Sequence, residues 1–290
     1  MSIPNPAAQR LGSRVWLAVA SVLALGAIAA FAWSKLPHGR LDGVQSYAVY
    51  YGTNLEYSAH LGDYDLGIVQ PNTLSIPAIK KLISSGKRLV AYITVGESDG
   101  PSLGLPKGWI LGENKNWGSK FVDANQTGWQ DRVLERATDI ISFGFSGFFL
   151  DTLDTVDLFP KTKPGMIRIV ERLRESFPNA VIVQNRGFAV LPETSKLIDA
   201  VMFEDYSTSF NFQTQQYLSS DGDASAVQLA QTAKQNGIKV LALDYADDPK
   251  LRRRAIDRAK VAGFIPFVTN ISLNTLESRA SQEPKAEARP

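Results

Sequence analysis

Short apolar runs recur along residues 46–268, and amphipathic stretches separate them. The runs are rich in β-branched and aromatic residues, which favour strands, and unbroken apolar runs of this length are typical of strands buried on both faces of a parallel sheet. The pattern predicts eight strands, at residues 46–51, 66–70, 88–95, 147–151, 180–184, 200–204, 239–244 and 264–268.

The stretches between the runs have the spacing of amphipathic helices. Four of the helices that we predict end directly before a glycine, at Gly86, Gly144, Gly237 and Gly263, and a fifth stops before Pro178. A glycine just past the last turn is the usual end of a helix, and a proline cannot continue one. The predicted helices are 76–85, 129–143, 164–177, 225–236 and 249–262, with shorter ones at 54–60 and 192–197.

Eight strands that alternate with helices in one domain indicate the α/β class and a (β/α)8 TIM barrel. An open, doubly wound sheet is the competing architecture. The strand count of eight and the lack of a glycine-rich phosphate loop after the first strand both favour the barrel. Residues 96–128 form a long connection rich in Gly, Pro, Asn and Trp, and loops of this length are often functional.

The first 33 residues read as a targeting segment. Arg10 and Arg14 precede a long apolar run at 15–33 that contains no charge. Two outcomes stay open: cleavage of a signal peptide after Ala-Phe-Ala at 30–32, a small-x-small site, or an uncleaved membrane anchor of just sufficient length. Either outcome predicts export, to the periplasm, the medium or the outer side of a membrane. The predicted organisation is then leader 1–33, linker 34–45, barrel 46–276 and disordered tail 277–290.

The composition narrows the chemistry. The chain has 290 residues, no Cys and two His. Its active site therefore cannot use a thiol, and a metal site built from several histidines is not expected. We expect no metal and no cofactor. The formal net charge of +2 belongs to the two leader arginines, which leaves the rest of the chain neutral and argues against a nucleic-acid partner. We expect the domain to act as a monomer.

Polar side chains collect where the predicted strands end, which is where barrel enzymes carry their active sites. Asp151 and Glu204 directly follow apolar strand residues, so each carboxyl should lie at the barrel mouth with little water. Such burial raises a carboxyl pKa, and two carboxyls in one cleft can divide the roles of acid and base or of acid and nucleophile. Asp154 and Asp205 fit helix capping equally well.

Aromatic residues gather at the same strand ends and in the long connection. A flat apolar face with a polar tip suits stacking on a sugar ring, although a single aromatic is more often part of a core. Paired carboxylates with aromatics, and without metal ligands or Cys, indicate glycoside hydrolysis. The aromatics are Tyr50, Tyr51, Tyr92, Trp109, Trp117, Tyr206 and Tyr245.

At these positions the sequence resembles the endo-α-1,4-polygalactosaminidases, the glycoside hydrolase family 114 type. The resemblance spans residues 45–272. The blocks AYITVGE at 91–97 and GFFLDTLD at 147–154 carry most of it, in order and at this spacing. Further support comes from YYG at 50–52, QNRGF at 184–188, FE at 203–204 and LDYA at 243–246. The connection at 97–127 matches poorly.

The resemblance implies a (β/α)8 barrel that cleaves galactosamine-containing polysaccharides of biofilms. It implies that the catalytic carboxylates are Asp151 on the fourth strand and Glu204 on the sixth, the same pair that the strand ends single out. It further implies cleft residues for substrate binding at Tyr50, Tyr92, Glu97, Asp154, Asn185, Asp244 and Tyr245.

We favour Asp151 as nucleophile and Glu204 as acid/base, with a cationic polysaccharide as the partner that the acidic strand ends attract. A carboxyl separation of about 5–5.5 Å predicts retention of configuration and one of about 6.5–9.5 Å predicts inversion. Two alternatives stay open: an exported carbohydrate-binding barrel without catalysis, and a glycosidase that acts on a different sugar.

Overall fold

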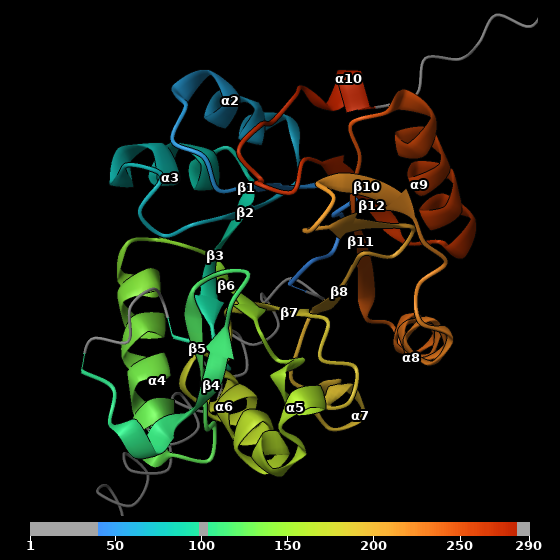
Figure 1. Ribbon diagram of the computed structural model, residues 1–290. Coiled ribbons are helices and arrows are strands. Elements are labelled where there is room, and N and C mark those ends of the chain that lie inside the picture. Colours follow the sequence, from blue (N-terminus) through green and yellow to red (C-terminus); the bar gives the residue numbers. More distant parts are fainter. Residues whose placement is uncertain (1–39, 99–103, 283–290) are drawn as a thin grey trace, which may run out of the picture. The chain divides into compact units, whose positions relative to one another are not determined.

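A computed structural model describes residues 40–98 and 104–282 (Figure 1). The chain divides into two units, Met1–Asp42 and Gly43–Pro290. The second unit contains the barrel that the sequence predicts. The predicted leader at 1–33 lies outside the described residues. Among the residues that are described, no helix has the length and apolar character needed to cross a bilayer.

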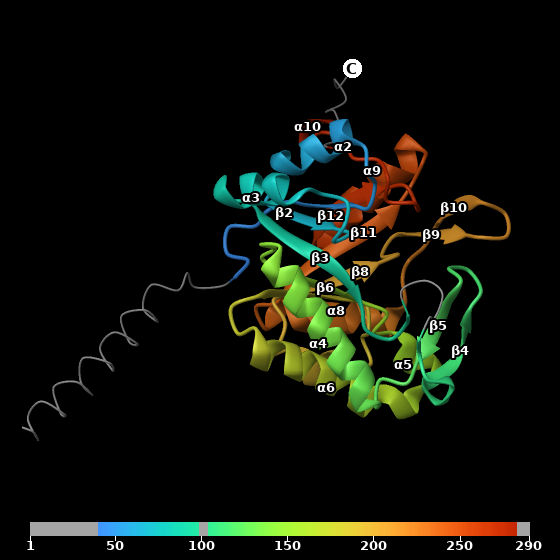
Figure 2. The same ribbon diagram turned by 90° about the vertical axis from the view of Figure 1, so that its left-hand side faces the viewer.

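Eight parallel strands form one sheet that curls into a nearly closed barrel (Figures 1 and 2). Along the sheet they run β1-β2-β3-β6-β7-β8-β11-β12, so each strand is followed in space by the next barrel strand in the chain. β12 lies beside β1 and brings the two edges together. The strands are β1 (Tyr47–Tyr50), β2 (Leu66–Val69), β3 (Arg88–Thr94), β6 (Gly147–Asp151), β7 (Val181–Asn185), β8 (Ala200–Glu204), β11 (Lys239–Tyr245) and β12 (Ile265–Thr269).

Helices cover the outside of the barrel (Figure 2). Three of the long ones begin with a capping side chain: Ser75, Asp223 and Asp248 cap α3, α8 and α9 by accepting backbone N–H bonds. The helices are α2 (Leu55–Ala59), α3 (Ile76–Ser84), α4 (Thr127–Ser142), α5 (Thr155–Leu158), α6 (Lys163–Ser176), α7 (Leu191–Thr194), α8 (Ala224–Gln235), α9 (Pro249–Ala262) and α10 (Arg279–Gln282).

The predicted fold class is confirmed. All eight predicted strands exist, two of them with the predicted bounds and the others differing by one residue at one or both ends. The strands are buried on both faces, as the unbroken apolar runs require: every residue of β1, β2 and β7 is buried. Folding therefore buries the side chains that face the barrel interior as well as those that face the helices. This burial of apolar surface is the main stabilisation of the barrel.

Two hairpins were not predicted. β4 (Ile110–Asn114) pairs with β5 (Ser119–Val122) inside the long connection after β3. β9 (Thr208–Asn211) pairs with β10 (Gln216–Ser219) in the connection after β8. The strands are short and largely exposed, so they lack the long apolar run that marks a barrel strand in the sequence. Both hairpins leave the barrel at the end where its strands finish (Figure 2).

Ordered residues lie on both sides of two predicted boundaries, and the predicted division into linker, barrel and tail stays a prediction. Val44 lies in the predicted linker, yet its side chain is fully buried in the unit that begins at Gly43. The predicted disordered tail begins at 277, but residues 279–282 form the helical turn α10. The Tyr64 hydroxyl also donates to the Glu277 carbonyl, which ties the start of this segment to the barrel. Residues 283–290 lie outside the described residues.

Candidate active site

A cleft of about 850 Å³ opens at the carboxyl ends of the barrel strands. Its walls come from the ends of several strands and from both hairpins. The lining includes six carboxyl side chains and two guanidinium groups: Glu97, Asp139, Asp151, Asp154, Glu204 and Asp205, with Arg136 and Arg186.

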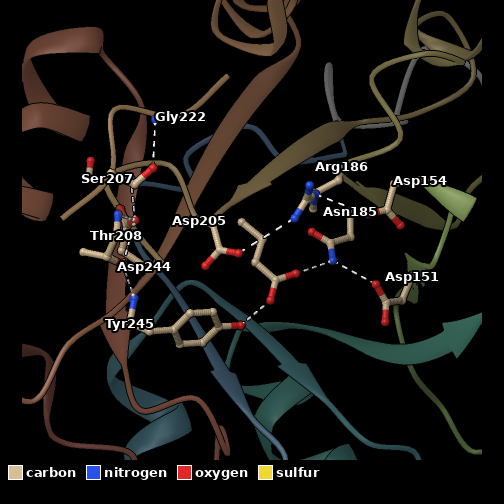
Figure 3. Close-up of polar contacts among 12 residues, drawn as sticks. Asp151, Asp154, Asn185, Arg186, Asp205, Ser207, Thr208, Gly222, Asp244 and Tyr245 are labelled. Atoms are coloured by element: carbon tan, nitrogen blue, oxygen red, sulfur yellow. Dashed lines mark hydrogen bonds and ion pairs between the residues drawn. The ribbon is translucent and has the colours of Figure 1, made fainter. Parts of the chain in front are cut away.

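Three strand ends place the central groups of this cleft. Asp151, Asn185 and Glu204 are the last residues of β6, β7 and β8, which are neighbours in the sheet. The Asn185 amide donates one hydrogen bond to Asp151 Oδ1 and one to Glu204 Oε2, each at 2.8 Å (Figure 3). Because one nitrogen reaches both oxygens, these two oxygens lie no more than twice that distance apart. Asn185 therefore fixes the spacing of the two carboxylates that the sequence singled out.

Glu204 occupies the more enclosed position of the pair. The Tyr245 hydroxyl, from the end of β11, donates to Glu204 Oε1. Burial raises the pKa of Glu204 and the neighbouring Asp151 charge raises it further, whereas the hydrogen bonds from Asn185 and Tyr245 oppose the shift. Burial raises the pKa of Tyr245 well above its usual value, and the nearby carboxylates of Glu204 and Asp205 raise it further, so its hydroxyl keeps its proton and remains a donor.

The backbone turns sharply just after each of these strands. Thr152, Arg186 and Asp205 directly follow the three site residues and have φ values of 66°, 48° and 59°. The left-handed region costs energy for residues other than glycine, and such residues concentrate at functional sites. The turn diverts the chain at once, so the last side chain of each strand remains at the mouth of the barrel. Thr152 is held in place because its hydroxyl oxygen accepts a hydrogen bond from the Gly96 N–H and shares another with the Thr94 hydroxyl.

Gly96 is required by this arrangement. A Cβ on it would lie 2.3 Å from both the Thr152 carbonyl oxygen and Thr155 Oγ1. The loop after β3 therefore packs directly against the loop after β6, which a larger residue would separate.

A second carboxyl pair flanks the first. Arg186 lies 3.3 Å from Asp154 Oδ2 and 3.8 Å from Asp205 Oδ2 (Figure 3). Burial raises the pKa of Asp154 to about 6 and that of Asp205 to about 7, and the Arg186 charge only partly offsets this. Asp154 makes no capping hydrogen bond to α5, so its carboxyl serves the cleft rather than the helix start. Asp205 Oδ1 and Asn185 Oδ1 are buried acceptors without a protein partner in the described part of the chain.

The structure brings most of the predicted substrate-binding residues to this cleft. Tyr92, Glu97, Asp154, Asn185 and Tyr245 line it together with the predicted catalytic pair. The Tyr92 ring packs edge-on against Tyr51 at 5.5 Å. Glu97 is mostly occupied with protein donors, because its carboxylate accepts from Asn114 Nδ2 at 3.1 Å and from the Ser119 hydroxyl. The catalytic and binding roles of these residues stay predictions.

Tyr50 and Asp244 lie outside the cleft lining. Tyr50 is fully buried, and its hydroxyl bonds to the backbone of Asn54. Asp244 accepts from the Ser207 and Thr208 N–H groups at 2.6 and 2.8 Å, which holds the turn after β8. The strand-end rule identified the correct edge of the barrel. It did not distinguish side chains that point into the cleft from those that support it.

Several cleft residues escaped the sequence analysis. Arg186 lies within the QNRGF block and Asp205 was a helix-cap candidate, but neither was assigned to the site, and Phe212 lies in a hairpin that was not predicted. Nothing in the sequence indicated the turn at Thr152, because a β-branched residue is not expected at positive φ. Within residues 40–98 and 104–282, no group of three or more Asp, Glu or His side chains is arranged to hold a metal ion.

The family model of glycoside-hydrolase family GH114 matches residues 44–284, which is most of the chain and all of the barrel. The chain belongs to glycoside-hydrolase family GH114. An uncharacterised protein of Deinococcus radiodurans is 27% identical over 273 residues, which cover 84% of this chain and 85% of the relative. The uncharacterised protein MJ1477 of Methanocaldococcus jannaschii is 24% identical over 247 residues, covering 74% and 70% of the two chains.

Solved structures agree with the family assignment. The glycoside hydrolase domain of PelA from Pseudomonas aeruginosa superposes with a TM-score of 0.74 and 27% identity, covering 81% of this chain and 99% of that domain. Ega3 of Aspergillus fumigatus, solved in complex with galactosamine, gives a TM-score of 0.65 at 16% identity, covering 83% and 96%. The Ega3 likeness shows a shared fold.

For a GH114 barrel, this site has the parts that glycoside hydrolysis needs. Two carboxyl groups lie within reach of one substrate bond, and their environments differ. The pKa of Glu204 is raised by burial, and a carboxyl group that holds its proton is what a general acid requires. Asn185 holds the pair at a fixed spacing and leaves its buried Oδ1 free to accept a hydrogen bond from a sugar hydroxyl or ammonium.

Proposed function

We propose that this GH114 protein is a retaining endo-glycosidase that cleaves α-1,4-linked polysaccharide containing galactosamine. Asp151 is the nucleophile that forms a glycosyl-enzyme ester, and Glu204 protonates the departing oxygen and then deprotonates the attacking water. The observation that carries the assignment is the Asn185 amide, which bridges the two carboxylates at 2.8 Å each. This bridge keeps the bonded oxygens well short of the roughly 6.5–9.5 Å typical of inverting enzymes and supports retention.

The assignment of roles follows from the two environments. A general acid must hold a proton near neutral pH, and burial together with the Asp151 charge raises the pKa of Glu204 in that direction. Asp151 is half-buried and faces the open cleft, as a nucleophile that reaches an anomeric carbon must. The two side chains come from strands separated only by β7, so the barrel itself sets their approach.

The charge of the cleft supports the choice of sugar. Six carboxyl groups and two guanidinium groups line it, although the chain beyond its leader is neutral. A partly deacetylated galactosamine polymer carries ammonium groups, and such a cleft attracts it while repelling anionic glycans. Galactosamine in the Ega3 complex is a property of that protein, and it makes this sugar the first to test.

The test uses purified wild-type protein and two isosteric variants, Asp151→Asn and Glu204→Gln, on a panel of α-1,4 polymers. We expect cleavage of partly deacetylated galactosaminan to a ladder of oligosaccharides. Weaker cleavage is expected for the fully acetylated polymer, with at least about 1,000-fold loss in either variant. Proton NMR of the first product should show the α anomer, since retention preserves the configuration. Full activity of either variant refutes the catalytic pair.

Two other outcomes point to the remaining functions. Tight binding of oligosaccharides without any product identifies a carbohydrate-binding barrel. Cleavage confined to a neutral polymer identifies a glycosidase of different specificity. An initial β anomer would keep the hydrolase but replace retention by inversion.

We also propose that the protein is exported by its first 33 residues. Arg10 and Arg14 followed by the uncharged apolar run at 15–33 support this, as in signal and anchor segments. Cell fractionation with N-terminal sequencing tests it. A mature chain that starts near Trp33 identifies a cleaved leader, and an intact chain in the membrane fraction identifies an anchor. An intact chain in the cytoplasm contradicts export.

A further inference from the structure

Two aromatic rings meet at the tips of the two unpredicted hairpins. Trp117 lies in the turn between β4 and β5, and Phe212 lies in the turn between β9 and β10. Their ring centroids are 5.5 Å apart with an interplanar angle of 83°, an edge-to-face contact. The hairpins leave the barrel at different places, one after β3 and one after β8, and both project from the same end (Figure 2).

Each hairpin has a firm base. Asn114 and Ser119, at the two ends of the β4–β5 turn, both donate to the buried carboxylate of Glu97. In the other hairpin, Phe210 packs against Phe212 at 5.1 Å and against Tyr217 at 4.9 Å. The Tyr217 hydroxyl also accepts a hydrogen bond from the Ile271 N–H, beyond β12. The contact between Trp117 and Phe212 therefore joins two hairpins that are each held in place by contacts with the rest of the domain.

The two hairpins arise on either side of the strands that carry Asp151 and Asn185. In the sheet, β6 and β7 lie between β3 and β8, and they end at these two residues. Trp117 and Phe212 line the same cleft as Asp151 and Asn185. The ring contact therefore belongs to the cleft that holds the two candidate catalytic carboxyl groups.

The exposure of the Trp117 and Phe212 rings is not explained by a contribution to the stability of the fold. The Trp117 side chain is 63% exposed and Phe212 is 38% exposed, so both keep large apolar surface in water at the cleft. An edge-to-face contact also leaves ring faces uncovered, and exposed aromatic faces at a carbohydrate cleft are suited to stacking on sugar rings. Exposure, position and mutual contact together indicate a ligand for this pair.

We propose that Trp117 and Phe212 are specificity-determining residues that form an aromatic clamp over the bound polysaccharide. This inference rests on the proposed glycosidase function. The clamp holds one segment of the chain against the ends of β6–β8 by stacking, outside the bond that is cleaved. The interior of a long polymer reaches the carboxylates only when the two tips separate, whereas the free end of a short oligosaccharide slides beneath the closed pair.

The chain contains no Cys, which gives a direct test. The double variant Trp117→Cys/Phe212→Cys carries the only two thiols, and a short bis-maleimide joins the tips covalently. The matched control is the same variant capped at both thiols with N-ethylmaleimide. Size-exclusion chromatography then follows cleavage of a high-molecular-weight galactosaminan, and mass spectrometry follows cleavage of short galactosamine oligosaccharides.

We expect the cross-linked protein to cleave the long polymer about tenfold or more slowly than the capped control, and to cleave short oligosaccharides at a similar rate. Equal rates on the long polymer refute the clamp. Loss of cleavage of both substrates also refutes it, because the linkage then blocks the cleft altogether. If the wild-type protein cleaves none of these substrates, the proposed function has failed, which is a separate result.

Single variants test the stacking role without a cross-link. Trp117→Ala and Phe212→Ala should each raise KM for the polymer about three- to tenfold with little change in kcat, since they remove binding away from the cleaved bond. Leu111→Ala and Leu218→Ala are matched controls: each removes an exposed apolar side chain from the same hairpins, outside the cleft lining. An unchanged KM in both aromatic variants contradicts the proposal.

Discussion

Tyr245 donates its hydroxyl hydrogen to Glu204, and this bond joins the end of β11 to the end of β8 inside the cleft. The bond stabilises the ionised form of Glu204 and so opposes the rise in pKa that burial and Asp151 produce. Tyr245 itself stays protonated, because burial and the Glu204 charge hold its pKa well above the usual value. The pair therefore sets the pH at which Glu204 gives up its proton.

Tyr245→Phe should shift the alkaline limb of the kcat profile to higher pH by about 0.5–1 unit. The reason is that the variant loses a donor to the carboxylate, so the charged form of Glu204 is less stable and its pKa rises. If Glu204 is the acid, its proton is needed and the alkaline limb moves. The pH dependence of kcat on galactosaminan measures this.

The same variant tests the division of roles. A shift of the acid limb, with the alkaline limb unmoved, means that ionised Glu204 is the active form and that it is the nucleophile. Tyr64→Phe is a suitable control, because it removes a hydroxyl that bonds to the Glu277 carbonyl outside the cleft lining. That variant should leave both limbs in place.

Asn185→Ala should lower kcat by about 100-fold or more while leaving the fold intact. The variant removes the donor that the Asp151 and Glu204 carboxyl groups share, so their spacing is no longer fixed. Steady-state kinetics with circular dichroism measures both effects. Asn54→Ala is the control, since Asn54 caps α2 and is absent from the cleft lining. A kcat within threefold of wild type for Asn185→Ala would remove the bridge from the mechanism.

The barrel was predictable because each of its strands is buried on both faces. Such a strand shows as an unbroken apolar run, and GFFLD at 147–151 and AVMFE at 200–204 have the predicted bounds. The glycines and Pro178 marked the helix ends. The hairpins were not predictable in this way, because β9 and β10 are four residues each and are stabilised mainly by pairing with one another. Pairing of this kind leaves little pattern in a single sequence.

The sequence was sufficient to predict at which end of the barrel the candidate site lies. Asp151 and Glu204 lie together as expected, because parallel strands end at the same side and their last residues share one opening. Asp244 also follows an apolar strand, yet its carboxylate is turned toward the backbone of Ser207 and Thr208. The reason is that β11 runs one residue further than predicted, to Tyr245. Successive side chains of a strand point to opposite faces, so Leu243 and Tyr245 line the cleft and Asp244 does not.

Glu97→Ala should loosen the β4–β5 hairpin more than it affects the chemistry. Glu97 is buried and accepts from Asn114 and Ser119, so its loss frees both ends of the turn that carries Trp117. Hydrogen exchange followed by mass spectrometry should show faster exchange over residues 110–122. KM for the polymer should rise by about three- to tenfold, with kcat changed less.

Glu97→Gln provides the comparison, because it keeps an oxygen acceptor for one of the two donors. Its exchange rates should lie between those of the wild type and the alanine variant. A collapse of kcat in Glu97→Gln with the hairpin fully protected would instead show that the carboxylate acts on the substrate, as the family resemblance implied.

Asp205→Asn should stabilise the protein above neutral pH. Burial, together with the Glu204 charge, raises the pKa of Asp205 from its ordinary 3.8 to about 7. The folded protein therefore holds a proton on Asp205 that the unfolded chain has lost, and the stability falls as pH rises from about 4 to about 7. An amide carries no charge to bury. Asn also tolerates the left-handed conformation at this position, where φ is 59°.

The gain should be absent at pH 4 and reach about 1–2 kcal/mol at pH 7.5, after allowance for the partial exposure of the side chain. Urea unfolding at a series of pH values measures it. Asp157→Asn serves as the control, since Asp157 is an exposed acid on α5 and its replacement should change stability little at any pH. A loss of stability in Asp205→Asn at pH 7.5 would mean that the ion pair with Arg186 outweighs the cost of burying the charge.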